Sequence, residues 1–299
     1  NWVRMNLLRH YDYVYAFIYS TSCLEFASWI SKEKKIPLIV HLADYSVSFK
    51  TSRIGEILIN CRKLFCITDD MKSEFESSTG RKDIEVLHNG AEERCYEIPT
   101  PNRVHFDSEN PFRLCFIGGL FSHLHGDCIE DIFKAVTEIR KRGFQCEFHL
   151  FGQRQPQEFL KELIKIQGVK HHGLIMPLDK RFEIMEKAHC FILPSSFNQQ
   201  NHCHYRYSFP TKLPELIASG RPIISYGPSD TSANRLLARN NLGIRIHKRS
   251  ISTLTNTIIK TIDSYAESIA KSSFLRTDGP KKFSAIQVRN KFSKIMNQI

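Results

Sequence analysis

The residues best suited to chemistry lie between Tyr207 and Ile224, where the pattern predicts a loop, a helix, a glycine stop and a buried strand. The unpaired amides and the positive dipole end at the start of a helix attract a diphosphate. Lys212 adds a compact positive charge beside them, and Glu215 can accept hydrogen bonds from ribose or sugar hydroxyls. The segment therefore predicts a site for a phosphorylated ligand that carries hydroxyl groups.

A second candidate segment, Cys115 to Asp127, runs from a predicted strand through Gly118 and Gly119. Glycines let the backbone approach a phosphate closely. Both segments also have an architectural interpretation: a plain strand-to-helix connection at the glycines, and Ser208 as a helix cap with Lys212 in solvent. Spacing alone favours that interpretation for the first segment and leaves the second undecided.

In the first third of the chain, the predicted strand 36–40 is followed by His41 and Asp44. The carboxyl ends of parallel strands form the ligand-binding edge of α/β sheets, so both side chains are candidates to orient a substrate. A capped loop residue explains His41 equally well, and both interpretations stay open.

Histidine and cysteine gather at His202–Cys203–His204, with His189 and Cys190 nearby. This set lacks the paired spacing of a four-ligand zinc site, so we expect no metal and no other cofactor. The nine cysteines include no CxxC pair, which predicts reduced thiols in the core.

Strand-like and helix-like patterns alternate along the chain, which predicts an α/β fold with parallel sheets. Strands are expected at 13–18, 36–40, 64–67, 84–87, 112–117, 147–151, near 169, at 190–193, at 222–226 and near 244. Helices are expected at 22–32, 54–61, from about 69, at 127–142, 157–167, 179–187, 213–219 and 232–239, with two more beyond 251 separated by Gly279–Pro280. The Asn89–Gly90 pair is expected to form a tight turn with positive φ.

The length of 299 residues and a proline-containing break in the alternation predict two Rossmann-like domains. The expected boundaries are 1–100 for the first domain, 101–111 for a linker, 112–275 for the second domain and 276–299 for a C-terminal helix that packs back on the first domain.

Composition narrows the class of protein. Hydrophobic residues make up 41% of the chain and charged residues 24%, and no apolar run is long enough to span a membrane. The formal charge of +11 favours anionic partners, but the cations are spread along the chain, so we expect no nucleic-acid binding. The basic stretch 271–294 is better suited to a peripheral contact with an anionic membrane. No leader peptide is visible, which predicts a cytoplasmic location.

The run Pro210–Thr211–Lys212 through Glu215 to Gly220–Arg221–Pro222 resembles the donor-site signature of retaining glycosyltransferases of the GT-B fold, family 4-like (glycosyl transferases group 1). That family has two Glu residues with seven residues between them. Glu215 matches the second, whereas Tyr207 stands in place of the first. Compared with this family, the first domain lacks its opening βα units and is expected to be incomplete.

The resemblance implies a role for each candidate residue. Three of them would be catalytic. Lys212 would hold the departing diphosphate, and His41 and Asp44 would orient the sugar or the acceptor. The implied donor-binding residues are Gly118, Gly119, Ser122, Gly152, Ile175, Tyr207, Ser208, Phe209, Pro210, Thr211 and Glu215. Residues 1–100 would be the acceptor-side domain and 112–275 the nucleotide-sugar-binding domain.

The implied reaction is metal-independent transfer of a sugar, with retention, from a nucleotide diphosphate sugar to a hydroxyl of a glycan or lipid-linked acceptor in surface glycan assembly. A nucleotide-sugar epimerase of the same architecture is an alternative. A second alternative is a non-catalytic nucleotide-sugar-binding remnant, because the first Glu and the usual basic pair near Gly119 are replaced.

Overall fold

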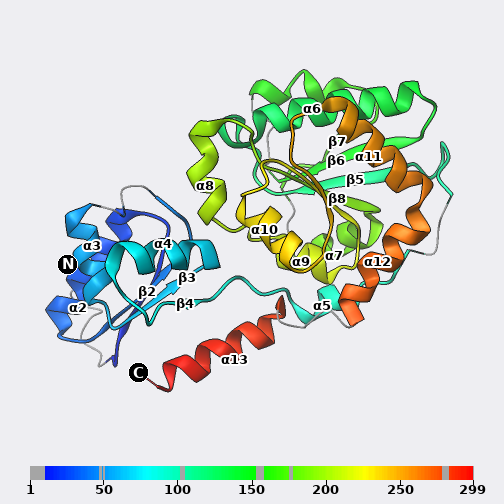
Figure 1. Ribbon diagram of the computed structural model, residues 1–299. Coiled ribbons are helices and arrows are strands. Elements are labelled where there is room, and N and C mark those ends of the chain that lie inside the picture. Colours follow the sequence, from blue (N-terminus) through cyan, green and yellow to red (C-terminus); the bar gives the residue numbers. More distant parts are fainter. Residues whose placement is uncertain are drawn as a thin grey trace. The chain divides into compact units, whose positions relative to one another are not determined.

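A computed structural model gives the structure of the chain for residues 11–46, 49, 51–101, 105–152, 158–174, 178–277 and 283–298 (Figure 1). The chain divides into two compact units. Unit 1 comprises Asn1–His88, Arg206–Phe209 and Asn290–Ile299, and unit 2 comprises Asn89–Tyr205 and Pro210–Arg289. Within the described ranges, no helix is long and apolar enough to cross a membrane.

Unit 1 contains a parallel sheet in the order β1-β2-β3-β4. Its strands are β1 (Val14–Ile18), β2 (Leu38–Leu42), β3 (Lys63–Cys66) and β4 (Glu85–Val86), and its helices are α2 (Thr21–Lys34), α3 (Ser52–Asn60) and α4 (Asp69–Thr79). Ser20 and Thr68 cap α2 and α4 by accepting a backbone N–H of the first turn. Every residue of β2 is buried, as expected for an inner strand of a parallel sheet.

Unit 2 contains a six-stranded parallel sheet in the order β10-β9-β8-β5-β6-β7. Its strands are β5 (Phe112–Ile117), β6 (Cys146–Phe151), β7 (Val169–His171), β8 (Cys190–Pro194), β9 (Ile223–Tyr226) and β10 (Ile244–Ile246). The order runs outward from β5 in both directions, which is the doubly wound topology of Rossmann-like folds.

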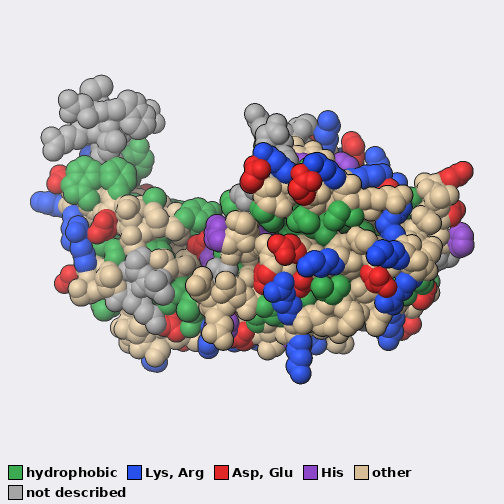
Figure 2. Space-filling view, turned by 90° about the horizontal axis from the view of Figure 1, so that it is seen from above, with side chains coloured by type: hydrophobic (Ala, Val, Ile, Leu, Met, Phe, Trp, Pro, Cys, Tyr) green, Lys and Arg blue, Asp and Glu red, His purple; other side chains and the backbone are tan. Residues whose placement is uncertain are grey.

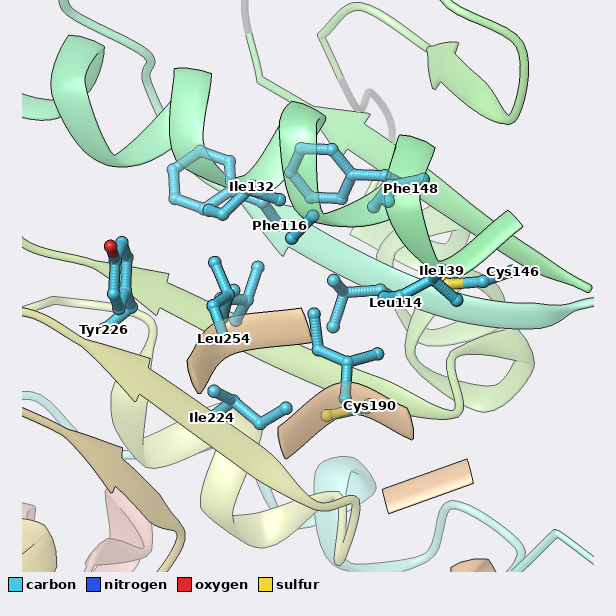
Figure 3. Close-up of a cluster of buried hydrophobic side chains, with 14 of the residues drawn as sticks. Leu114, Phe116, Ile132, Ile139, Cys146, Phe148, Cys190, Ile224, Tyr226 and Leu254 are labelled. Atoms are coloured by element: carbon cyan, nitrogen blue, oxygen red, sulfur yellow. The ribbon is translucent and has the colours of Figure 1, made fainter. Parts of the chain in front are cut away.

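Helices cover both faces of this sheet (Figure 1). The helices of this unit are α5 (Glu93–Tyr96), α6 (Ser122–Lys141), α7 (Leu178–Lys187), α8 (His202–Tyr207), α9 (Leu213–Ala218), α10 (Ser232–Arg239), α11 (Ile251–Asp263) and α12 (Tyr265–Thr277). The last helix, α13 (Ala285–Met296), begins in unit 2 and ends in unit 1. Ile132 and Ile139 of α6 and Leu254 of α11 pack against Leu114 and Phe116 of β5 in a buried cluster (Figure 3). Removing this apolar surface from water stabilises the unit.

Most elements lie where the sequence places them, and β5 and α10 match to the residue. The helix expected at 157–167 is wrong: its described part forms two single 3₁₀ turns, Glu158–Leu160 and Leu163–Lys165. Leu160 is nevertheless buried in the core, so packing of individual side chains overrides the helical pattern. The described part of the tail from residue 251 has three helices rather than two, because α11 ends at Asp263, with Ser264 as its C-cap, before α12 begins.

The helix expected from 127 begins earlier, at Ser122, because Gly126 lies inside α6 instead of ending a loop. The positive φ predicted for the Asn89–Gly90 turn is also wrong. Gly90 does not have positive φ, and a side chain there would meet the backbone of Ala285 at 2.5 Å. Close backbone approach, rather than a left-handed turn, requires glycine at this position.

All nine cysteines are free, and only Cys23 and Cys203 are exposed. Burial raises the pKa of Cys61 to about 11 and that of Cys95 to about 12, so these thiols stay protonated and unreactive. On the face drawn in Figure 2, Lys and Arg side chains are interspersed with Asp and Glu instead of forming one basic area.

Candidate functional site

The carboxyl edge of the unit 2 sheet holds a cluster of glycines at the ends of three neighbouring strands. Gly118 follows β5 and Gly152 follows β6, and the Gly152 N–H donates to the carbonyl of Gly173 after β7 at 2.8 Å. A Cβ on Gly152 would lie 1.9 Å from the Gly118 carbonyl oxygen. The strand ends therefore meet backbone to backbone beside the switch point between β5 and β8, where α/β sheets bind ligands.

Helix α6 begins directly after this glycine edge. Its N-cap, Phe121, provides no side-chain cap, and its first turn contains no acidic residue. His125 of the same helix accepts the Phe121 N–H at 3.4 Å, but the first turn carries no carboxylate, so the positive end of the helix dipole favours an anion near Ser122. Gly118, Gly119, Gly152 and Ser122, four of the predicted donor-binding residues, are thus brought to one edge of unit 2.

Lys212 and Glu215 lie at the start of α9, where Lys212 is the N-cap residue. The Lys212 side chain is 36% exposed, and its Nζ lies 3.9 Å from Glu215 Oε2. Pro210 accepts the Leu213 N–H at 2.9 Å and closes the turn that leads into the helix. The ammonium group is therefore accessible to a ligand while it remains close to a carboxylate.

Glu215 is buried and forms an ion pair that the sequence did not predict. Its Oε1 lies 3.1 Å from Nη2 of Arg181 on α7, and the same nitrogen lies 3.3 Å from Oε1 of Glu92. Burial raises the pKa of Glu215, although Lys212 and Arg181 partly offset that effect. Nothing in the motif spacing points to Arg181, because the contact depends on how α7 packs beside α9.

In unit 1 the structure brings together Asp44 and Ser208. Asp44 Oδ1 accepts hydrogen bonds from the Ser208 hydroxyl and from the Tyr45 N–H, the latter at 3.0 Å. The Tyr45 N–H also lies 3.2 Å from Ser208 Oγ. One acidic oxygen is therefore held by two donors from separate parts of the chain.

The neighbours of Ser208 are also held within unit 1. The Tyr207 hydroxyl donates to Glu74 at 2.8 Å, and the Tyr207 carbonyl accepts the Thr68 hydroxyl at 2.7 Å. The rings of Phe209 and His88 stack with centroids 5.9 Å apart. Residues 207–209 of the predicted donor loop therefore each form a hydrogen bond or a ring contact within unit 1.

His41 lies inside β2 rather than beyond its end, because the strand continues to Leu42. The side chain is 4% exposed, and both ring nitrogens are bonded at 2.8 Å: Nε2 donates to the Leu87 carbonyl, and Nδ1 accepts from the Tyr15 hydroxyl. Burial lowers the pKa of His41 to about 4, so the ring is neutral. Its catalytic role stays a prediction, and it requires His41 to release one of these bonds.

Two further sequence hypotheses concern residues elsewhere. Ile175 lies outside the described residues. Of the histidines considered for zinc, His202 pairs with Asp230, and His189 Nδ1 accepts the Arg113 N–H at 2.9 Å while its ring stacks on Phe112.

Comparison with known proteins identifies a matching family profile and solved structures of similar fold. The family profile described as "Glycosyl transferases group 1" matches residues 111–264. No curated protein sequence matches the chain. Among solved structures, HepE of Anabaena, crystallised with UDP and glucose, has a TM-score of 0.76 and 16% identity, covering 99% of this chain and 80% of that one.

Two other solved structures show the same likeness. Sucrose-phosphate synthase from Thermosynechococcus elongatus has a TM-score of 0.71 and 13% identity, covering 99% of this chain and 76% of its own. WaaG, a glycosyltransferase involved in lipopolysaccharide biosynthesis, has a TM-score of 0.64 and 15% identity, covering 93% and 84%. At these identities the likeness establishes the fold, which is the GT-B type with Rossmann-like parallel sheets.

Proposed function

The chain belongs to the glycosyl transferases group 1 family, and from that premise we propose that it transfers a sugar from a nucleotide diphosphate sugar to a hydroxyl acceptor. The observation that carries the proposal is the glycine edge of unit 2, where Gly118 and Gly152 meet beside the N-terminus of α6. This edge lies within the residues that the family profile matches. It would offer backbone N–H groups and the positive end of a helix dipole to a diphosphate.

Stabilisation of the leaving group supplies most of the proposed catalysis. As the bond between the sugar and the diphosphate breaks, negative charge develops on the departing phosphate. The amides near Gly119 and the ammonium of Lys212 would donate hydrogen bonds to that charge, which lowers the energy of the transition state. Glu215 would accept hydroxyls of the ribose with the oxygen that faces Lys212, since its other oxygen is held by Arg181.

The finer assignments belong to the same proposal. Transfer with retention, as in family 4-like enzymes, needs no metal if Lys212 and the helix amides neutralise the diphosphate. Asp44 and His41 would orient the sugar or the acceptor hydroxyl. HepE was crystallised with UDP and with UDP-glucose, which supports testing uridine nucleotides first. A glycan or lipid-linked acceptor in surface glycan assembly, reached through a peripheral membrane contact, remains the proposed context.

The decisive experiment measures release of free nucleoside diphosphate from a panel of nucleotide sugars, with and without EDTA. We expect Lys212→Ala to lower kcat/KM by on the order of 100-fold with the fold unchanged. Lys180→Ala, on the exposed side of α7, is the matched control and should behave as the parent. Full activity of Lys212→Ala would remove that residue from the mechanism, and loss of activity in EDTA would contradict metal independence. Isomerised sugar without free diphosphate would identify an epimerase instead.

A further inference from the structure

A line of polar side chains crosses β6 and β7 in unit 2 and ends at the carboxyl edge of the sheet. Lys170 Nζ lies 2.8 Å from Glu147 Oε1, and Glu147 Oε2 lies 2.9 Å from His149 Nε2. His149 Nδ1 in turn lies 3.0 Å from His172 Nε2. The imidazole of His149 therefore connects a carboxylate to a second imidazole.

This arrangement fixes which nitrogen of each ring carries a proton. Burial opposes ionisation of Glu147, but the hydrogen bonds from Lys170 and His149 outweigh it and lower the pKa of the carboxyl. A carboxylate only accepts hydrogen bonds, so His149 Nε2 must carry the proton. Burial also lowers the pKa of His149 to about 4, which keeps the ring neutral and leaves Nδ1 with a lone pair.

The same reasoning then applies to His172. Because His149 Nδ1 accepts, His172 must donate from Nε2. Burial lowers the pKa of His172 as well, so this ring is also neutral. A neutral imidazole has one N–H group, and the remaining nitrogen, Nδ1, is an acceptor. Glu147 thus determines, through His149, that His172 offers a lone pair at Nδ1.

His172 is at the ligand-binding edge of the sheet. It directly follows β7, and it precedes Gly173, whose carbonyl accepts the Gly152 N–H. Its ring stacks on Phe151 with centroids 4.4 Å apart and an interplanar angle of 10°, and the side chain remains exposed. Since neighbouring strands are about 4.8 Å apart, the end of β7 is roughly 10 Å from the Gly118 edge of β5.

We propose that His172 accepts a hydrogen bond from a ring N–H of the donor's nucleobase, and that Glu147 and His149 act as positioning residues that hold His172 in the accepting tautomer. The inference rests on the proposed function, which places the diphosphate near Gly118. Uracil and guanine present a ring N–H on their pairing edge. Cytosine and adenine present a lone pair there, which the His172 lone pair repels. The substrate class is therefore a uridine, thymidine or guanosine diphosphate sugar, because thymine carries the same ring N–H as uracil.

The test measures the affinities of UDP, GDP, CDP and ADP by calorimetry. We expect UDP or GDP to bind at least tenfold more tightly than CDP and ADP. In Glu147→Gln the amide can donate as well as accept, so both tautomers of the relay become possible and the preference should fall at least fivefold. Glu162→Gln makes the same chemical change at an exposed Glu–Lys pair in the same unit and should keep the preference.

A second measurement does not depend on ligand. Ring ¹⁵N shifts of the histidines, assigned with His172→Phe, should show His172 protonated at Nε2 in the parent and mixed in Glu147→Gln. Protonation at Nδ1 in the parent, or an unchanged nucleotide preference in Glu147→Gln, would overturn the relay while leaving the proposed function intact. Failure of all four nucleotides to bind would instead overturn the proposed function, and the nucleobase role with it.

Discussion

The hydroxyl of Ser208 donates to the carboxylate of Asp44, although 164 positions separate the two residues in the sequence. Both belong to unit 1, and Ser208 is buried. Hydrogen bonds to a charged group contribute about 1.5–3 kcal/mol. Ser208→Ala should therefore lower the free energy of unfolding in urea by about 2 kcal/mol. Ser264→Ala removes an exposed bond to a helix carbonyl and should change it by less than about 0.5 kcal/mol. Equal effects would show that the Asp44 bond contributes nothing specific.

Gly152 should tolerate no side chain. In Gly152→Ala the new methyl group would overlap the Gly118 carbonyl oxygen, so two strand ends must separate. We expect a loss of about 3 kcal/mol in stability and weaker nucleotide binding. Gly55→Ala, in α3 with open space around it, should stabilise the protein by about 0.5–1 kcal/mol. Thermal unfolding of the two variants compares the signs directly, and a neutral Gly152→Ala would refute the close approach.

Arg181 should matter more for stability than its neighbour Arg94. Arg181→Met leaves the buried Glu215 carboxylate with only Lys212, so we expect a loss of about 2–3 kcal/mol at pH 8. The loss should shrink at lower pH, because burial already raises the pKa of Glu215 and protonation removes the unpaired charge. Arg94→Met breaks an exposed pair with Asp179 and should cost under about 1 kcal/mol. The measurement is urea unfolding at pH 8 and pH 5.5, and a pH-independent loss would contradict the account.

Stability should fall as the solution is acidified below pH 6.5. Burial lowers the pKa of His41 and of His189 to about 4, whereas an unfolded histidine titrates near 6.5. Between these values the unfolded chain binds one more proton per histidine than the native chain. The free energy of unfolding therefore rises with pH by about 1.4 kcal/mol per pH unit for each such residue.

The contribution of His189 can be isolated by substitution. His189→Asn keeps an acceptor for the Arg113 N–H but cannot titrate. Between pH 7.5 and pH 5.5, its loss of stability should be smaller than that of the parent by about 1.4 kcal/mol. An identical loss in both proteins would assign the acid sensitivity to other groups.

The sequence predicts what depends on local pattern and leaves out what depends on distant packing. The alternation of strands and helices placed β5 and α10 to the residue, because burial on both faces of a parallel sheet gives distinct apolar runs. The apolar run of β5 also showed that Gly118 and Gly119 follow the end of a strand, so the glycine edge could be predicted. The burial of His41 could not be predicted, since its partners Tyr15 and Leu87 come from other strands and connections.

The same limit applies to Arg181 and to the relay through His149. Each depends on which side chains two neighbouring elements place opposite each other, and one-dimensional spacing does not contain that information. Gly90 illustrates the point within a motif: the glycine was noticed, but its reason is Ala285, far along the chain.

Unit 1 is assembled from three separate stretches of the chain, the last of which is Asn290–Ile299. During synthesis the first stretch is translated long before Ser208 and Phe292. The Ser208 hydroxyl bonds to Asp44 in that stretch, and the Phe292 ring packs against Tyr15 and Phe65. The packing of unit 1 is therefore completed only after the residues of unit 2 have been translated. A nascent chain halted before residue 206 would hold the first sheet of unit 1 without these contacts.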